Sequence, residues 1–164
     1  MKNLVLVFTA LLLCVQAQAQ INIKEVARPE VVASKLNPVS EIFEVVKYPA
    51  DTAAFYCLVV QTNNRYDDRM QIWLGTSTDE ALASLRQLLG LLDEKIGSRY
   101  EVELLTGMAR IKVSENGTAL FPTKNNKTAL YLSAEGFAGA QVLTRKILES
   151  LIKDTERYGK NVND

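Results

Sequence analysis

The sequence contains no histidine, and this absence excludes several chemistries. Histidine is the commonest general base near neutral pH and the commonest metal ligand. Ser-His-Asp and Cys-His hydrolysis both need its imidazole, so both are excluded. The two cysteines of the chain cannot supply a four-thiolate zinc site. We therefore expect neither a metal site nor a cofactor.

An excess of positive charge is missing as well. The 164 residues include 19 basic and 19 acidic side chains, which gives a formal net charge of zero. Proteins that bind nucleic acids usually carry a concentrated basic patch, because phosphate contacts dominate their affinity. The balanced charge therefore argues against a nucleic-acid partner.

The first nineteen residues have the layout of a secretory signal peptide. A positive start at Lys2 precedes an apolar run over residues 4–15, and Ala17 and Ala19 supply the small residues of a cleavage site. The apolar run is too short for an ordinary membrane span. We expect cleavage after Ala19 and export to a bacterial periplasm, to the cell surface or to the medium, with no membrane-spanning segment left. A buried N-terminal helix is the structural alternative.

The positions of the two cysteines bear on lipid attachment and on what stabilises the exported chain. Lipid attachment at Cys14 is an alternative to simple cleavage, but a lipobox needs a small residue before the cysteine, and Leu13 is bulky. Cleavage after Ala19 removes Cys14 and leaves Cys57 as the single cysteine. A single cysteine forms no intramolecular disulfide. The mature chain must then be stabilised by its core, and its length suits one domain.

The beginning of the mature chain is predicted to be an arm followed by three strands. Residues 20–38 have weak periodicity and two prolines, which indicates an N-terminal arm with a helical turn at 30–35. The single domain is expected over 39–164. Its first strands are predicted at 41–48, 54–61 and 70–75, and the second of them is apolar on both faces, which favours a central position.

Two helices are predicted from apolar residues at helical spacing. A capping-box pattern from Ser77 to Glu80 precedes the first helix, expected over 78–95. Its buried stripe is expected to consist of Leu82, Leu85, Leu88, Leu89 and Leu92. The second helix is expected over 135–158. Its buried stripe is expected to consist of Val142, Leu143, Ile147, Leu151 and Ile152.

Four strands are predicted between the two helices. Residues 100–104 and 109–114 alternate between charged and apolar side chains. A turn at Thr106-Gly107 would set Glu103 opposite Arg110 and Glu101 opposite Lys112.

The later strands follow from turn signals. Asn116-Gly117 predicts a hairpin that joins 109–114 to a strand at 118–122. A further strand is expected at 128–133, in a register that keeps Leu120, Leu130 and Leu132 on the core face.

The element order βββα-ββββα predicts an α+β fold. We expect a two-layer sandwich in which both helices cover one face of a mainly antiparallel sheet of six or seven strands. Residues 72–75 and 130–133 each precede a leucine-rich helix, and the order reads as strands then helix, twice. An internal duplication is one interpretation. The other is that any strand leading into an amphipathic helix produces this pattern.

The sheet face opposite the helices is the candidate binding surface. Alternation along the strands places three aromatic and four charged residues there: Trp73, Phe121, Tyr131, Glu101, Glu103, Arg110 and Lys112. Tryptophan, tyrosine and arginine contribute most of the binding energy at protein interfaces. The alternative is that the N-terminal arm covers Trp73 and Tyr131, while the charged residues form a solvated ladder.

The acidic and thiol groups do not indicate an active site. Glu101 and Glu103 could be the carboxylates of a glycosidase, but such a pair must lie on two sides of a cleft. Ion pairs with the basic residues explain them better. Cys57 lies in the most apolar strand and has no histidine to activate it, so we expect it in the core. Asp67 and Asp68 lack the spacing of a calcium loop. We therefore expect no enzyme activity.

Three hypotheses remain open for the function. The first is an exported, non-catalytic binding or interaction protein that holds a protein or small-molecule ligand on the open sheet face. The alternative is a small inhibitor or immunity-type protein that blocks a secreted enzyme through a loop at 62–69 or 123–127. A histidine-free carboxylate hydrolase is the third.

Glycan acceptor patterns at Asn116, Asn126 and Thr52 all lie in predicted loops.

Overall fold

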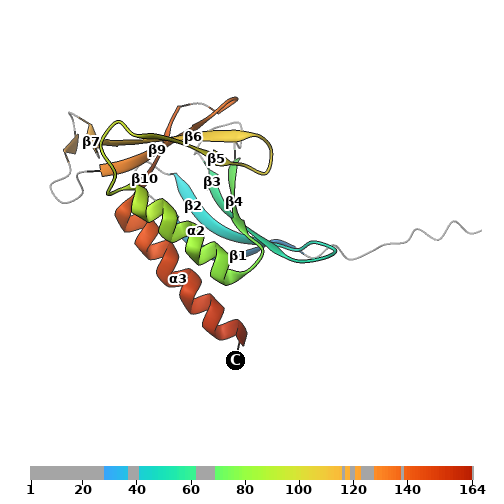
Figure 1. Cartoon of the computed structure of the whole chain (residues 1–164). Helices are drawn as coiled ribbons and strands as arrows, with labels where there is room; N and C mark the ends of the chain where they lie inside the picture. The colour runs from blue at the N-terminus through green and yellow to red at the C-terminus, as the bar shows by residue number, and fades with distance from the viewer. Residues whose placement is uncertain are drawn as a thin grey trace, which may run out of the picture.

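The computed structural model describes residues 28–36, 41–61, 69–115, 117–118, 121–122, 128–137 and 139–163. Within these ranges the chain is an α+β protein with two four-stranded antiparallel sheets and two helices (Figure 1). The predicted signal peptide, with Cys14, and residues 20–27 of the arm lie outside the described residues. So do the loop residues 62–68 and 123–127.

The first sheet contains the four strands that precede the first described helix. They are β1 (Glu30–Leu36), β2 (Ile42–Tyr48), β3 (Phe55–Gln61) and β4 (Arg69–Gly75), and they lie in the order β1-β2-β3-β4. All neighbours are antiparallel. Residues 56–60 of β3 are buried on both faces of the sheet, which confirms the predicted central position.

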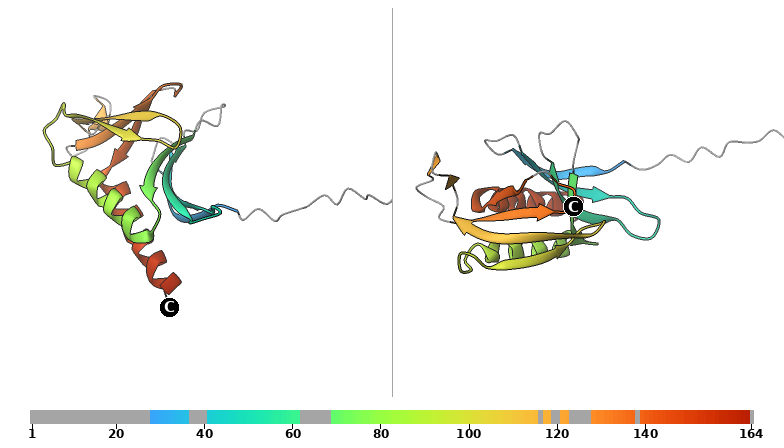
Figure 2. Two further views of the ribbon diagram at one scale, coloured as in Figure 1. Left: turned by 45° about the vertical axis from the view of Figure 1, so that its right-hand side comes forward. Right: turned by 90° about the horizontal axis from the view of Figure 1, so that it is seen from above.

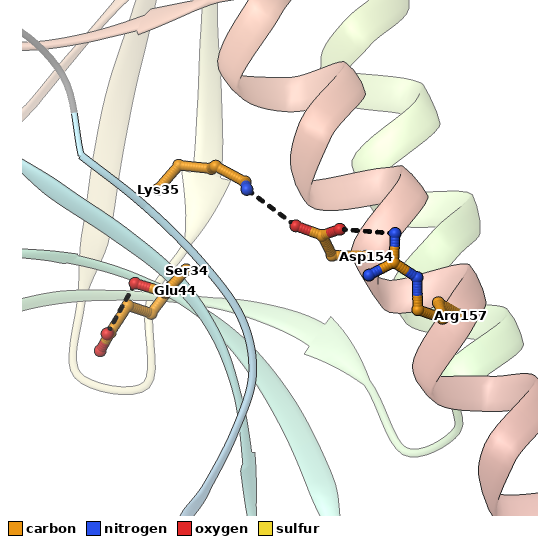
Figure 3. A network of polar contacts seen from close by, with 5 residues as sticks. All are labelled: Ser34, Lys35, Glu44, Asp154 and Arg157. Carbon is orange, nitrogen blue, oxygen red and sulfur yellow. Dashed lines mark hydrogen bonds and ion pairs between the residues drawn. The ribbon is translucent and has the colours of Figure 1, made fainter.

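The helical turn predicted at 30–35 is wrong, because this segment is strand β1. A β-bulge between Val31 and Ala33 interrupts its pairing with β2 and conceals the alternation that marks a strand. Side chains on the two faces of β1 have different partners. Lys35 forms a 2.9 Å ion pair with Asp154 of the last helix, and Ser34 donates to Glu44 at 3.0 Å (Figure 3).

The second sheet contains four strands that lie between the two helices in the sequence. They are β5 (Arg99–Glu103), β6 (Met108–Glu115), β9 (Thr128–Ala134) and β10 (Gln141–Thr144), in the order β10-β9-β6-β5. The predicted pairing of 109–114 with 118–122 is wrong, because β6 pairs with β9. The short strands β7 (Gly117–Thr118) and β8 (Phe121–Pro122) pair with each other instead. β6 pairs with β9 over seven residue pairs. The predicted partner, residues 118–122, is shorter and ends in a proline, so it could form fewer hydrogen bonds with β6. Leu120 lies outside the described residues.

The strand count differs from the prediction of one sheet with six or seven strands. The described residues form eight strands in two four-stranded sheets, besides the short β7–β8 pair. The chain order is four strands then a helix, twice. Strand β1, which the sequence did not reveal, completes the first half, and β10 completes the second.

The turn between β5 and β6 lies one residue earlier than predicted. Leu104 donates its backbone N–H to the carbonyl of Gly107 at 3.0 Å, and Gly107 adopts a φ of 101°, which favours glycine. The register therefore shifts by two residues, so that Glu101 faces Arg110, and Glu103 faces Met108. A shift of two keeps every side chain on its face. The predicted faces are confirmed, and the predicted charge pairs are wrong.

Helix α2 (Thr78–Leu91) begins at the predicted capping box. The Ser77 hydroxyl accepts a hydrogen bond from the Glu80 N–H at 3.2 Å, and the Glu80 carboxylate accepts one from the Thr76 N–H at 2.6 Å. These contacts satisfy N–H groups that have no partner within a helix. The helix ends earlier than the predicted residue 95. Its stripe is as predicted, with Leu82, Leu85, Leu88 and Leu92 buried and Leu89 half-buried.

Helix α3 (Arg145–Asn163) begins ten residues later than predicted. Val142 and Leu143 belong to strand β10, so their predicted place on a helical stripe is wrong. Burial alternates along β10, and the hydroxyl of Thr144 accepts a hydrogen bond from the Ile147 N–H at 3.4 Å, which marks the beginning of the helix. The remaining members of the predicted stripe, Ile147, Leu151 and Ile152, are buried.

One continuous hydrophobic core joins both helices to both sheets. Helix α2 packs on β4 and β3, α3 packs on β1, β2 and β10, and the two helices pack against each other. Figure 2 shows the helices on the inner side of both sheets, which meet at a steep angle. At this junction an isolated bridge links Ile72 of β4 to Leu104, and the Leu105 N–H donates to the Gln71 carbonyl at 3.0 Å.

Two helical glycines provide a test of how closely the helices pack. A Cβ at Gly159 would lie 2.9 Å from Cγ2 of Thr78. Rotating Thr78 away would break its 3.0 Å hydrogen bond with the Tyr56 hydroxyl. A Cβ at Gly90 would meet no atom within 4 Å.

We expect Gly90→Ala to raise the free energy of unfolding by up to about 1 kcal/mol, because alanine has the higher helix propensity. Gly159→Ala should lower it by about 1 kcal/mol or more, because the steric overlap outweighs that gain. Urea denaturation of both variants measures the difference. Equal stabilisation by the two substitutions would contradict the close approach of α3 to Thr78.

Candidate functional site

The predicted site residues are divided between the two sheets. Trp73 lies in β4 of the first sheet and is 39% exposed. Five others lie on the second sheet: Glu101, Glu103, Arg110, Lys112 and Tyr131. Phe121 is part of β8, and its side chain lies outside what the structure describes. The seven residues therefore do not gather on one sheet face.

The charged residues form a ladder on the outer face of the second sheet, the face turned away from the helices. Glu101 faces Arg110 across β5 and β6, and Lys112 lies between Arg99 and Tyr131. The four charged side chains are exposed. Tyr131 is half-buried, and its hydroxyl donates to the Glu115 carbonyl at 3.2 Å. Exposed charges of this kind contribute little to stability.

Three aromatic rings stack on the outer face of the first sheet, and we call them the aromatic row. Tyr48 of β2 and Trp73 of β4 lie on the two sides of Phe55 of β3, each with a centroid distance of 5.2 Å. The interplanar angles are 15° and 20°. Sequence reasoning selected only Trp73. Alternation along the strands at 41–48 and 54–61 was the signal that could have added the other two.

A small apolar cluster lies under the aromatic row. Val46, Cys57 and Val59 are buried there, apart from the main core, and Tyr48 and Phe55 pack against them. Gln71 donates to the Tyr48 hydroxyl at 2.7 Å. Burial raises the pKa of Tyr48, an effect that this hydrogen bond partly offsets. The part of the outer face that carries the aromatic row is therefore packed and largely apolar.

Two further apolar side chains are exposed near the junction of the sheets. Leu105 is 38% exposed and Met108 is 52% exposed, both in the β5–β6 hairpin. The Leu105 N–H bonds to Gln71, which is two residues from Trp73 along β4. The hairpin thus borders the strand that carries Trp73. We call the aromatic row together with Leu105 and Met108 the outer patch.

A polar cleft of about 1130 Å³ lies on the other side of the first sheet, at the beginning of α2 and the end of α3. Lys47 of β2 reaches it and donates to the Tyr158 hydroxyl at 3.4 Å, and that hydroxyl donates to Glu30 at 2.6 Å.

The protonation of this network bears on the enzyme hypothesis. The Tyr158 hydrogen bond raises the pKa of Lys47, and burial followed by the contact with Glu30 raises the pKa of Tyr158. Lysine and tyrosine general bases need lowered pKa values. This network therefore does not supply a base at neutral pH.

Cys57 is completely buried in β3, and burial raises the pKa of its thiol to about 11. The thiol is therefore protonated at pH 8, and nucleophilic attack requires the thiolate. We expect a folded chain that begins at Gln20 to be inert to an aromatic disulfide reagent at pH 8. One thiol per chain should react after unfolding in guanidinium chloride. Rapid reaction of the folded protein would contradict the burial of Cys57.

No helix in the described part of the chain is long and apolar enough to span a membrane. The same residues contain no group of three or more cysteine, aspartate or glutamate side chains that could hold a metal ion. No protein-family model, no curated protein and no solved structure matches the chain.

Proposed function

We propose that this chain is an exported, non-catalytic interaction protein that docks a partner protein on the outer patch. The observation that carries the proposal is the row of stacked aromatic rings, continued toward the sheet junction by exposed Leu105 and Met108. Exposed apolar surface of this kind commonly marks an interaction site. The signal-peptide layout of residues 1–19 supports export.

The arrangement of the rings favours a protein over a sugar or a base. Sugars and bases bind aromatic side chains by stacking on an open ring face. Both faces of Phe55 are occupied, one by Tyr48 and the other by Trp73. Phe55 therefore offers no open ring face, and the row with its apolar neighbours suits the interdigitating contacts of a protein interface.

Charged residues next to the outer patch would form the polar rim of the interface. Glu103 lies opposite Met108, and the neighbouring pair Glu101 and Arg110 continues across the second sheet. Protein interfaces combine an apolar centre with such a rim, and tryptophan is among the residues whose truncation costs most affinity. Two parts of the predicted set thus have a role in this proposal, with Trp73 as anchor and the charged residues at the edge.

The alternative of an enzyme inhibitor would also give a stable complex with one protein. Apart from Arg69, the loops that would carry the inhibitory contact, residues 62–69 and 123–127, lie outside the described residues. The outer patch therefore supports the general interaction hypothesis, while inhibition remains a prediction from the sequence.

A photo-crosslinking amino acid placed at Met108 in the producing cell tests the proposal. We expect one discrete crosslinked product of defined mass, because the side chain would lie within the interface. The same amino acid at Ile96, which is 49% exposed outside the outer patch, should give none.

Two substitutions then test whether the outer patch itself is responsible. Trp73→Ala and Leu105→Ser should each reduce the crosslink at position 108 at least tenfold, while circular dichroism shows an intact fold. Leu105 lies in a turn, so its replacement should cost little stability. Absence of a discrete product at 108, or an undiminished product in both variants, would contradict docking on the outer patch.

A further inference from the structure

The polar cleft lies between one end of the first sheet and the two helices. Its walls come from β2, from the segment before β3, from the beginning of α2 and from the end of α3. Its charged lining residues are Lys47, Asp79, Arg86, Glu156 and Lys160. A volume of about 1130 Å³ is ample for a small molecule, since ligand pockets range from about 300 to 1,000 Å³.

The base of the cleft is fixed by packing. Tyr56 is 4% exposed on the inner face of β3, and its hydroxyl bonds to the Thr78 hydroxyl at 3.0 Å. Leu82 of α2 is buried beside it in the same core. Gly159 allows α3 to approach Thr78, so both helices contribute to one side of the cleft. These contacts join segments that are far apart in the sequence into one preformed wall.

The charges that line the cleft are not all paired. Arg86 and Glu156 neutralise each other in a 2.7 Å ion pair. Neither Lys47 nor Lys160 forms a salt bridge with any residue that the structure describes. Asp79 is the remaining acid, and it lies in the first turn of α2, where the helix dipole favours a negative charge.

We propose that this cleft binds a small molecule through an anionic group, a carboxylate or a phosphate, held by Lys47 and Lys160. Lysines from two different elements line one cavity, and neither forms a salt bridge among the described residues. Lys47 reaches Glu30 only through the Tyr158 hydroxyl, so a bound anion would give both lysines a charge partner in direct contact. Lysine is cationic at neutral pH, and the hydrogen bond from Lys47 to the Tyr158 hydroxyl raises the pKa of Lys47 further. The N-terminus of α2 adds nothing to the argument, because Ser77 and Glu80 already cap it.

The site is independent of the proposed docking surface. Lys47 lies on the inner face of the first sheet, where it pairs in register with Tyr56. Trp73 lies on the outer face of the same sheet. A variant of the cleft therefore leaves the outer patch intact, and the two proposals can fail separately.

Titration of the mature protein with inorganic phosphate and, separately, with succinate tests the proposal, with amide chemical shifts as the readout. We expect at least one probe to give saturable shifts at Thr76, Thr78 and Lys47, with a millimolar dissociation constant. Saturation by phosphate alone identifies a phosphate ligand, and saturation by succinate alone identifies a carboxylate. Glycerol, an uncharged probe, should cause no saturable shift.

Three lysine variants distinguish the cleft from general charge attraction. Lys47→Met and Lys160→Met should each weaken binding of the effective probe about tenfold. Lys153→Met removes an exposed charge from the same helix and should leave binding unchanged. Lys160 is exposed near the end of α3, so its replacement keeps the test valid if Lys47→Met fails to fold. Failure of both probes to saturate, or equal weakening by all three variants, would overturn the proposal.

Discussion

The structure depends on one pair of helices covering the inner faces of two sheets at once. Each sheet has an apolar inner face, and burying that surface is the main favourable contribution to folding. Helix α2 packs on β4 and β3, α3 packs on β1 and β10, and the helices pack on each other. The core is therefore continuous, and the fully buried Leu85 and Leu148 lie in it together with Ile111 of β6.

This shared core determines where both candidate sites lie. Both helices lie on the inner faces, so neither sheet has a helix on its outer face. The sheets meet where Ile72 bridges to Leu104. The outer patch lies on the solvent side of that junction. The polar cleft lies on the inner face of the first sheet, beside the beginning of α2 and the end of α3. One surface is apolar and suited to a protein, and the other is polar and suited to a small anion.

Local patterns predicted the elements whose signals are undisturbed. The capping box at Ser77 and the leucine stripe identified α2, and continuous apolar sequence identified central β3. Strand β1 was missed because its bulge breaks the alternation of apolar and polar side chains. Strand β10 was missed because its four residues directly precede α3, and its two apolar residues continue the apolar pattern of that helix. Likewise, Trp73 was identified by alternation, whereas its stacking with Phe55 depends on a pairing register that no single strand encodes.

Native-state amide hydrogen exchange of a Leu85→Ala variant tests the shared core most directly. Leu85 is fully buried, and such a truncation typically costs about 2–5 kcal/mol. If the sheets share one core, the most protected amides of β3 and of β6 should lose the same amount of protection free energy, because both open only in global unfolding. Loss of protection in β3 with β6 unchanged would show two separately stable sheets and contradict the account.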